Sequence, residues 1–116
     1  MRGTGKSFRV LLQTLYVASL QKGKKDVILW CANQHEVDHN LRLLMGMMYA
    51  LSGVRRVRTN IIMPNNVTIR VMNMKNVERE TVGLHMEDFI EFQDNTYDFD
   101  EYLKFETYMR ARRRTK

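Results

Sequence analysis

Residues 2–7 read RGTGKS, and the chain continues from them directly into a pattern of apolar residues with helical spacing. Glycines let backbone N–H groups curl around phosphate oxygens, and the positive end of a helix attracts the same oxygens. Lys6 is expected to reach the outer phosphates and Ser7 to bind Mg²⁺. The predicted cofactors are ATP and Mg²⁺, and the predicted nucleotide-binding residues are Gly3, Thr4, Gly5, Lys6 and Ser7.

The full pattern of such a loop is G-x-x-x-x-G-K-[ST]. Gly5, Lys6 and Ser7 match its end, and its first glycine falls one residue before Met1. The strand that should precede the loop is also absent from the sequence. We therefore expect a small nucleotide-binding sheet that lacks its first strand.

Apolar residues downstream alternate between helical and extended spacing. Helices are predicted over residues 6–21, 34–52 and 99–112, strands over 26–32, 57–63, 67–72 and 89–92, and a loop over 73–85. The continuous run DVILWCA at residues 26–32 predicts a strand buried on both faces, as in a parallel sheet under helices. Asn33 and Gly53 are the expected start and end signals of the second helix. Residues 64–66, Pro-Asn-Asn, predict a turn between two strands.

This order predicts a single α/β domain over residues 1–116, a three-layer fold with helices flanking a sheet and a basic C-terminal helix over 99–116. The chain has 116 residues and 44% of them are hydrophobic, enough for one core. No run of apolar residues is long enough to cross a membrane, so no membrane partner is expected. The single cysteine, Cys31, rules out an internal disulfide and fits a reducing compartment.

The net charge is +6, and the basic residues are clustered. Such clusters suit a polyanion, so DNA is the predicted partner. The predicted nucleic-acid-binding residues are Arg55, Arg56 and Arg58 in one cluster and Arg110, Arg112, Arg113 and Arg114 in another. Between the clusters, residues 87–101 hold seven acidic residues and no Lys or Arg. That stretch is interpreted as a solvated acidic surface, with a metal site or pairing with a second copy as alternatives.

The stretch RGTGKS, with Arg2 before its first glycine, resembles the phosphate loop of phage terminase large subunits, the ATPases that pump DNA into capsids. Residues 27–33, VILWCAN, are similar to the second core strand of that ATPase. Residues 81–94, TVGLHMEDFIEFQD, are similar to the segment that leads into its second acidic strand. The resemblance covers roughly residues 2–95 and implies a P-loop NTPase core.

The family segment ends in Asp-Glu, which hold Mg²⁺ and position the attacking water, but Gln93 and Asp94 stand at the matching positions here. The resemblance therefore implies Lys6, Arg2 and Asp94 as catalytic residues, with Ser7 and Asp94 on Mg²⁺. It also implies a larger phage assembly or self-association, and a location in the host cytoplasm or the virion. The matching family proteins carry a nuclease domain that is not found in this sequence.

Two alternatives stay open. A non-enzymatic module of the same descent would bind nucleic acid or a partner protein through the basic clusters without turnover. Residues 35–39, HEVDH, also match the H-E-x-x-H pattern, in which His35 and His39 face one side of a helix and bind Zn²⁺ while Glu36 acts as general base. That zinc hydrolase alternative needs a third ligand from elsewhere in the chain.

Overall fold

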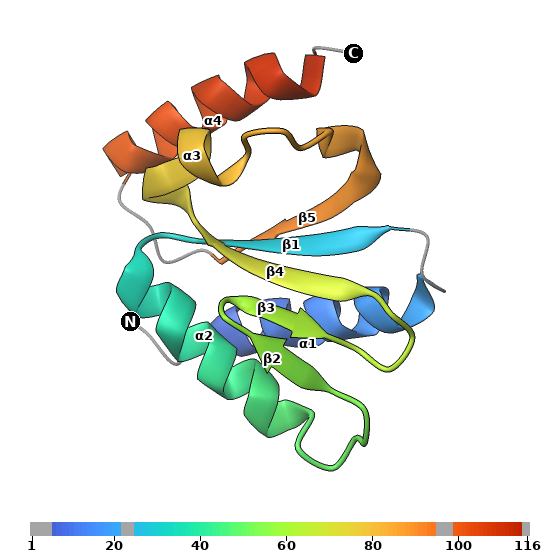
Figure 1. The fold of residues 1–116 in the computed structure, drawn as a ribbon. Helices are drawn as coiled ribbons and strands as arrows, with labels where there is room; N and C mark the ends of the chain where they lie inside the picture. Colours follow the sequence, from blue (N-terminus) through green and yellow to red (C-terminus); the bar gives the residue numbers. More distant parts are fainter. Residues whose placement is uncertain (1–5, 22–24, 95–98, 115–116) are drawn as a thin grey trace.

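The computed structural model describes residues 6–21, 25–94 and 99–114. In this part of the chain, helices cover both faces of one five-stranded sheet (Figure 1). The elements in chain order are α1 (Lys6–Leu20), β1 (Asp26–Cys31), α2 (Gln34–Met47), β2 (Arg55–Val57), β3 (Asn60–Ile62), β4 (Thr68–Asn73), η1 (Met74–Asn76), α3 (Val77–Glu80), η2 (Met86–Asp88), β5 (Phe89–Gln93) and α4 (Phe99–Arg114). The predicted α/β class and the helices flanking the sheet are confirmed. None of the described helices is long and apolar enough to cross a membrane.

The strand order is β2-β3-β4-β1-β5, and β1 lies in the middle of three parallel strands. Leu29 of β1 pairs with Val71 of β4 on one side and with Phe92 of β5 on the other. Every residue of β1 after Asp26 is buried. The prediction that this apolar run forms a strand buried on both faces is therefore confirmed.

Alternation along β1 divides the interior into two cores. Val27, Leu29 and Cys31 face α1 and α2, where they pack with Leu41 and Leu44. Ile28 and Trp30 face α3 and α4, and the Trp30 ring meets the Phe105 ring edge-on with centroids 4.9 Å apart. The sheet is thus the shared wall between two apolar cores.

Helix α1 follows its predicted range closely, but it is apolar on two sides. Leu11 and Ala18 are buried against the sheet. Four further apolar side chains at four-residue intervals are about half exposed; they are Phe8, Leu12, Tyr16 and Leu20. This exposed row of α1 is not explained by the packing of the described residues.

Helix α2 begins as predicted, because the Asn33 side chain accepts a hydrogen bond of 2.9 Å from the Glu36 backbone N–H. Its predicted end at residue 52 is wrong, since the helix ends at Met47. Beyond that point Tyr49 and Leu51 are exposed, so continued helix would bury no further apolar surface. Gly53 instead occupies a turn with φ of +89°, a conformation that favours glycine.

The predicted strand over residues 57–63 is also wrong, because a turn divides it into β2 and β3. Arg58 takes φ of +59° at this turn, and Val57 pairs with Asn60. The next predicted turn is confirmed: the Met63 N–H donates to the Val67 carbonyl at 2.9 Å, and β3 and β4 run antiparallel. The predicted loop over 73–85 contains η1 and α3, where Asn73 caps η1 through the Lys75 N–H.

Candidate functional site

Strands β1, β4 and β5 are parallel, so their carboxyl ends meet at one edge of the sheet. Helix α1 begins on this same side of the sheet, which is the left side of Figure 1. Crevices outside the carboxyl ends of parallel strands are the usual ligand sites of α/β sheets. We call this region the carboxyl edge.

Asp94 follows β5 directly and is 2% exposed. Its backbone N–H donates to the Trp30 carbonyl over 2.9 Å, which extends the pairing of β5 with β1 by one residue. Its side-chain Oδ2 accepts a 2.7 Å hydrogen bond from Asn40 Nδ2. The predicted acidic residue therefore lies buried at the carboxyl edge, held by both β1 and α2.

Asn40 connects three elements at this edge. The residue has no exposed surface, and its Nδ2 also lies 3.2 Å from the Cys31 Sγ at the end of β1. Its Oδ1 is buried and has no hydrogen-bond partner among the described residues. Buried polar atoms usually have a hydrogen-bond partner, and this oxygen and the Arg70 Nε are the two buried side-chain atoms of the described residues that have none.

Glu36 is the second buried carboxylate of the described residues, and it is 5% exposed. It lies one helical turn before Asn40, so the two share a face of α2. Burial raises the pKa of the Cys31 thiol to about 12; the hydrogen bond from Asn40 lowers it, and the charges of Asp94 and Glu36 raise it further. Cys31 is therefore a neutral thiol at the edge, and a poor nucleophile or metal ligand.

Cys31 and Asn40 were not predicted as site residues, and Glu36 was predicted only as the general base of the zinc alternative. A signal was available, since Val37, Leu41 and Leu44 define the buried face of the second helix, and Glu36 and Asn40 each precede one of them. Polar residues at the border of an apolar helix face point into the molecule rather than into water. What the sequence did not reveal is that Asp94 would meet them there.

The predicted phosphate loop lies mostly outside the described residues: Arg2, Gly3, Thr4 and Gly5 precede them. Lys6 and Ser7 form the first turn of α1. Their side chains also lie outside the described part of the chain, so their roles on phosphate and Mg²⁺ stay predictions.

Two of the predicted nucleic-acid-binding arginines have partners within the fold. Arg112 donates to the Thr81 and Leu84 carbonyl oxygens over 2.9 and 2.7 Å, which ties α4 to the segment after α3. Arg113 donates twice to Glu91, over 2.8 and 3.1 Å, and once to Glu106, over 2.9 Å. These bonds give both guanidinium groups a structural role.

The remaining predicted arginines differ in their setting. Arg110 is exposed on α4, and the side chain of Arg114 lies outside the described residues. Arg55, Arg56 and Arg58 are exposed on the β2–β3 hairpin, at the sheet edge farthest from β5. Of the two predicted basic clusters, the hairpin is thus the one whose charges project into solvent.

The acidic stretch over residues 87–101 is only partly a solvated surface. Glu87, Asp88 and Asp100 are exposed, whereas Asp94 is buried. The Glu91 carboxylate accepts a 2.9 Å bond from Trp30 Nε1 and is paired with Arg113. Glu91, which interrupts an apolar strand, thus takes a place in a hydrogen-bonded network beneath α4.

The H-E-x-x-H pattern does not form a metal centre in the described part of the chain. His35 is exposed and His39 half-buried on α2, while Glu36 is buried. No group of three or more His, Cys, Asp and Glu side chains is placed to hold a metal ion in that part of the chain. The zinc alternative therefore gains no support from the geometry.

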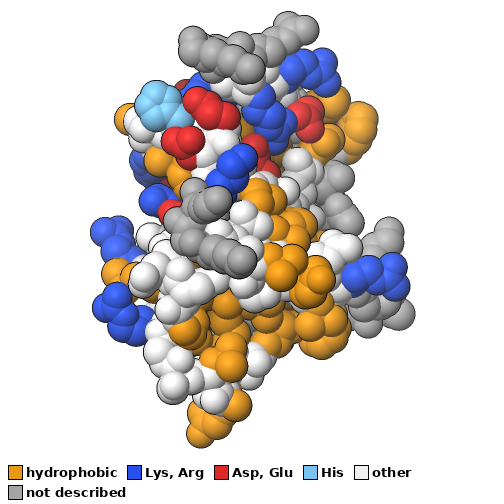
Figure 2. All heavy atoms as spheres, turned by 90° about the vertical axis from the view of Figure 1, so that its right-hand side faces the viewer, with side chains coloured by type: hydrophobic (Ala, Val, Ile, Leu, Met, Phe, Trp, Pro, Cys, Tyr) orange, Lys and Arg blue, Asp and Glu red, His pale blue; other side chains and the backbone are white. Residues whose placement is uncertain are grey.

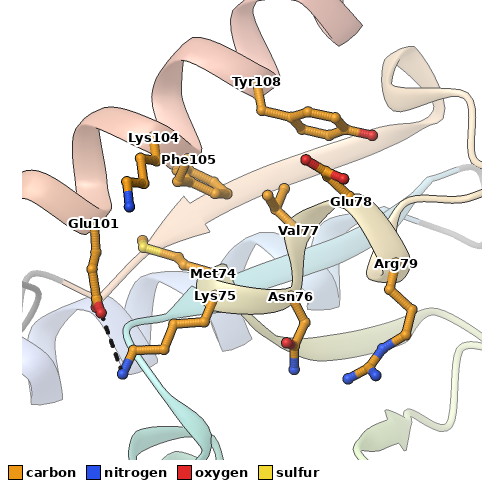
Figure 3. A pocket seen from close by; sticks show the side chains of 10 residues that line it. All are labelled: Met74, Lys75, Asn76, Val77, Glu78, Arg79, Glu101, Lys104, Phe105 and Tyr108. Atoms are coloured by element: carbon orange, nitrogen blue, oxygen red, sulfur yellow. Dashed lines mark ion pairs between the residues drawn. The ribbon is translucent and has the colours of Figure 1, made fainter.

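A cavity of about 510 Å³ lies between η1, α3 and α4, on the face of the sheet opposite α1 (Figure 3). Met74, Val77 and Phe105 supply apolar lining, and Lys75 forms a 3.3 Å ion pair with Glu101. Its polar lining carries charges of both signs. It is a site separate from the carboxyl edge.

Comparison with known protein families, with curated proteins and with solved structures gives no match for this chain. The resemblance to terminase large subunits therefore rests on the quoted motifs alone.

Proposed function

We propose that this chain binds the phosphate groups of ATP, with Mg²⁺, at the carboxyl edge. The observation that carries the proposal is the convergence there of the start of α1, which bears Lys6 and Ser7, with the buried carboxylate of Asp94. A helix start attracts phosphate, and a buried carboxylate close to it is suited to the accompanying cation.

The donor set at the edge fits Mg²⁺ rather than a softer metal. Mg²⁺ is usually held by one or two carboxylates together with substrate phosphates and waters, and it prefers oxygen ligands. Asp94 supplies a carboxylate, and the unpaired Oδ1 of Asn40 is a further oxygen nearby. When bound, Mg²⁺ would neutralise phosphate charge; Ser7 and Asp94 are the residues that would hold it, as the resemblance to terminases implies.

Turnover requires a group that positions water, but Gln93 rather than a carboxylate precedes Asp94, and Glu91 of β5 is bound to Trp30 and Arg113 beneath α4. Glu36 is the other buried carboxylate of the described residues, and it comes from α2. We therefore propose nucleotide binding as the primary activity of this chain, in the context of DNA handling that the terminase resemblance implies. Hydrolysis would be slow or lost.

The test is titration of the protein with a fluorescent ATP analogue in the presence of Mg²⁺. Lys6→Ala is expected to weaken binding at least about tenfold, because a charge-assisted phosphate contact is lost. Asp94→Asn is expected to weaken binding only when Mg²⁺ is present. Lys25→Ala is the matched control, since Lys25 is an exposed lysine before β1, at the opposite edge of the sheet.

Equal affinities for the wild type, Lys6→Ala and Lys25→Ala would show that the nucleotide proposal is wrong. A wild-type protein that shows no saturable binding would do the same. Circular dichroism on each variant establishes that affinity losses do not come from unfolding.

A second candidate function, nucleic-acid binding without turnover, is favoured by the charge of one region. Residues 40–77 contain no Asp or Glu and six Lys or Arg. Three of these, Arg55, Arg56 and Arg58, project from the β2–β3 hairpin. Arginines placed this way can contact successive phosphates of a nucleic acid backbone.

The salt dependence of duplex DNA binding tests this candidate. Replacing Arg55, Arg56 and Arg58 together by Ala is expected to reduce the slope of log affinity against log salt by up to about 2.7, or 0.9 per phosphate contact. The control replaces Lys25, Arg79 and Lys104, three exposed cations elsewhere, and removes the same net charge. If both triple variants change the slope equally, only net charge matters and the hairpin is not a binding site.

A further inference from the structure

The two outer strands of the sheet differ in how they are protected from pairing with another strand. β2 is three residues long and carries exposed Arg55 and Arg56, the kind of short, charged edge that discourages pairing. β5 is five residues long, and its residues are half-buried. Among the described residues β5 pairs on one side only, with β1, and its sequence FIEFQ has no Lys, Arg or Pro.

The one charged residue of β5 does not guard this edge. Glu91 accepts hydrogen bonds from Trp30 Nε1 at 2.9 Å and from Arg113 at 2.8 and 3.1 Å, so its charge is neutralised on the α4 side. On the other side of the strand, Ile90 and Phe92 pack partly against the core beneath α1 and α2. The edge is therefore apolar on one face, and on the other its one carboxylate is held in an ion-pair network under α4.

We propose that β5 is a self-association surface, at which the β5 strands of two copies pair antiparallel about a two-fold axis through Glu91. In that register Ile90 of each copy lies opposite Phe92 of the second copy, which gives two aliphatic–aromatic cross-strand pairs on one face. The two Glu91 side chains meet near the axis, and each is paired with the Arg113 of its own copy, which also contacts Glu106. This proposal is independent of the nucleotide proposal, because it uses none of the phosphate-loop residues.

A strand pair alone is small, since stable interfaces bury roughly 1,200–2,000 Å² in total. The exposed row of α1 supplies apolar surface on the same face of the sheet as Ile90 and Phe92, and α1 contacts β5 directly. The row consists of Phe8, Leu12, Tyr16 and Leu20, which are 47–66% exposed. Figure 2 shows hydrophobic side chains gathered in the lower right part of the molecule, on the side where α1 lies. The second copy would cover this row.

Sedimentation velocity over a range of protein concentrations tests the proposal. The wild type is expected to reach twice the mass of one chain as its concentration rises. Ile90→Lys places an ammonium group in the centre of the pair and is expected to weaken association by more than about 100-fold. Leu12→Lys, in the exposed row of α1, is expected to weaken it less.

The matched control is Val57→Lys, which makes the same kind of change on the other outer strand, where Val57 is 45% exposed. It is expected to associate like the wild type. A wild type that stays monomeric at every concentration would overturn the proposal, as would a dimer that Ile90→Lys leaves intact.

Because Ile90 is half-buried, its variant could lose the fold rather than the interface. Amide hydrogen exchange on the wild type avoids this problem. Dilution below the dissociation constant is expected to speed exchange of β5 amides at least about tenfold while β4 amides stay unchanged. A dimer that dissociates on dilution with no change in β5 exchange would place the interface elsewhere.

Discussion

Asn40 has no exposed surface, yet among the described residues only its amino group has hydrogen-bond partners. Leaving a buried carbonyl oxygen unpaired costs roughly 1–3 kcal/mol, so such an atom is rarely retained for packing alone. Its amino group meanwhile directs the Asp94 carboxylate. At the residue scale, the carboxyl edge thus contains a buried oxygen that the described residues leave without a hydrogen bond.

The pH dependence of stability at Cys31 is the first prediction. The thiol ionises near 9.0 when unfolded but only near 12 when folded, because burial disfavours the thiolate. The unfolded state loses its proton first, so stability is intact below pH 9 and falls as pH rises toward 12. Between pH 7 and pH 10, the unfolding free energy of the wild type should therefore fall by about 1 kcal/mol more than that of Cys31→Ala.

Urea unfolding of both proteins at pH 7 and pH 10 measures this effect. A difference between them that does not change with pH would contradict the assigned burial of the thiol. Slow reaction of the native thiol with a disulfide reagent at pH 8, and fast reaction after denaturation, is the accompanying expectation.

The Arg113 network gives the second prediction. The hydrogen bonds to Glu91 raise the pKa of Arg113. Burial lowers this pKa and the contact with Glu106 raises it further, so the guanidinium stays charged. Arg113→Ala leaves the half-buried Glu91 with Trp30 as its remaining described partner and should lower the unfolding free energy by roughly 1–2 kcal/mol. Arg110→Ala, an exposed neighbour on α4, should change it by less than about 0.5 kcal/mol. Equal effects in the two variants would show that the Arg113 bonds do not contribute to stability.

At the scale of elements, helix starts and strand cores follow local chemistry, whereas element ends follow packing. Asn33 caps α2 because its side chain reaches the Glu36 N–H, an arrangement that needs only neighbouring residues. The end of α2 at Met47 depends instead on where the sheet stops offering apolar contact. The turn at Arg58 likewise depends on the pairing of β2 with β3.

The third prediction concerns this cap. Asn33→Ala removes the acceptor for the Glu36 N–H and should lower the unfolding free energy by about 1 kcal/mol. Asn33→Asp retains an acceptor oxygen and should therefore keep most of the wild-type stability. Gln34→Ala, an exposed change in the same turn, serves as the control. An Asn33→Ala variant as stable as wild type would mean that water replaces the cap.

On the scale of the whole molecule, the sheet separates two cores but links them through the same strands. Leu44 belongs to the core beneath α1 and α2, and Met109 to the core beneath α4. Both side chains are fully buried. The structure therefore predicts that the chain unfolds in one cooperative transition. It also predicts that a substitution in one core leaves the packing of the other core unchanged.

The fourth prediction tests that arrangement by combining Leu44→Ala with Met109→Ala. Each is expected to cost about 2–5 kcal/mol, and the double variant should equal their sum within about 0.5 kcal/mol. Chemical unfolding followed at Trp30 and by circular dichroism should show one shared transition. Two separated transitions would show instead that the cores unfold apart, and a marked excess over the sum would show coupling through the sheet.

The sequence by itself determined the α/β class, the buried central strand, the starts of α1, α2 and α4 and the apolar face of α2. These features follow from local periodicity and capping, which depend only on residues that are close together in the sequence. Only the tertiary structure decided that Asp94 meets Asn40, 54 residues away, and that Arg113 neutralises Glu91. Contacts of that kind depend on strand order and on which side chains share an edge, and no local pattern encodes either. The exposed row of α1 has the same origin: helical spacing identifies apolar residues, but the packing of the other elements decides which of them are covered.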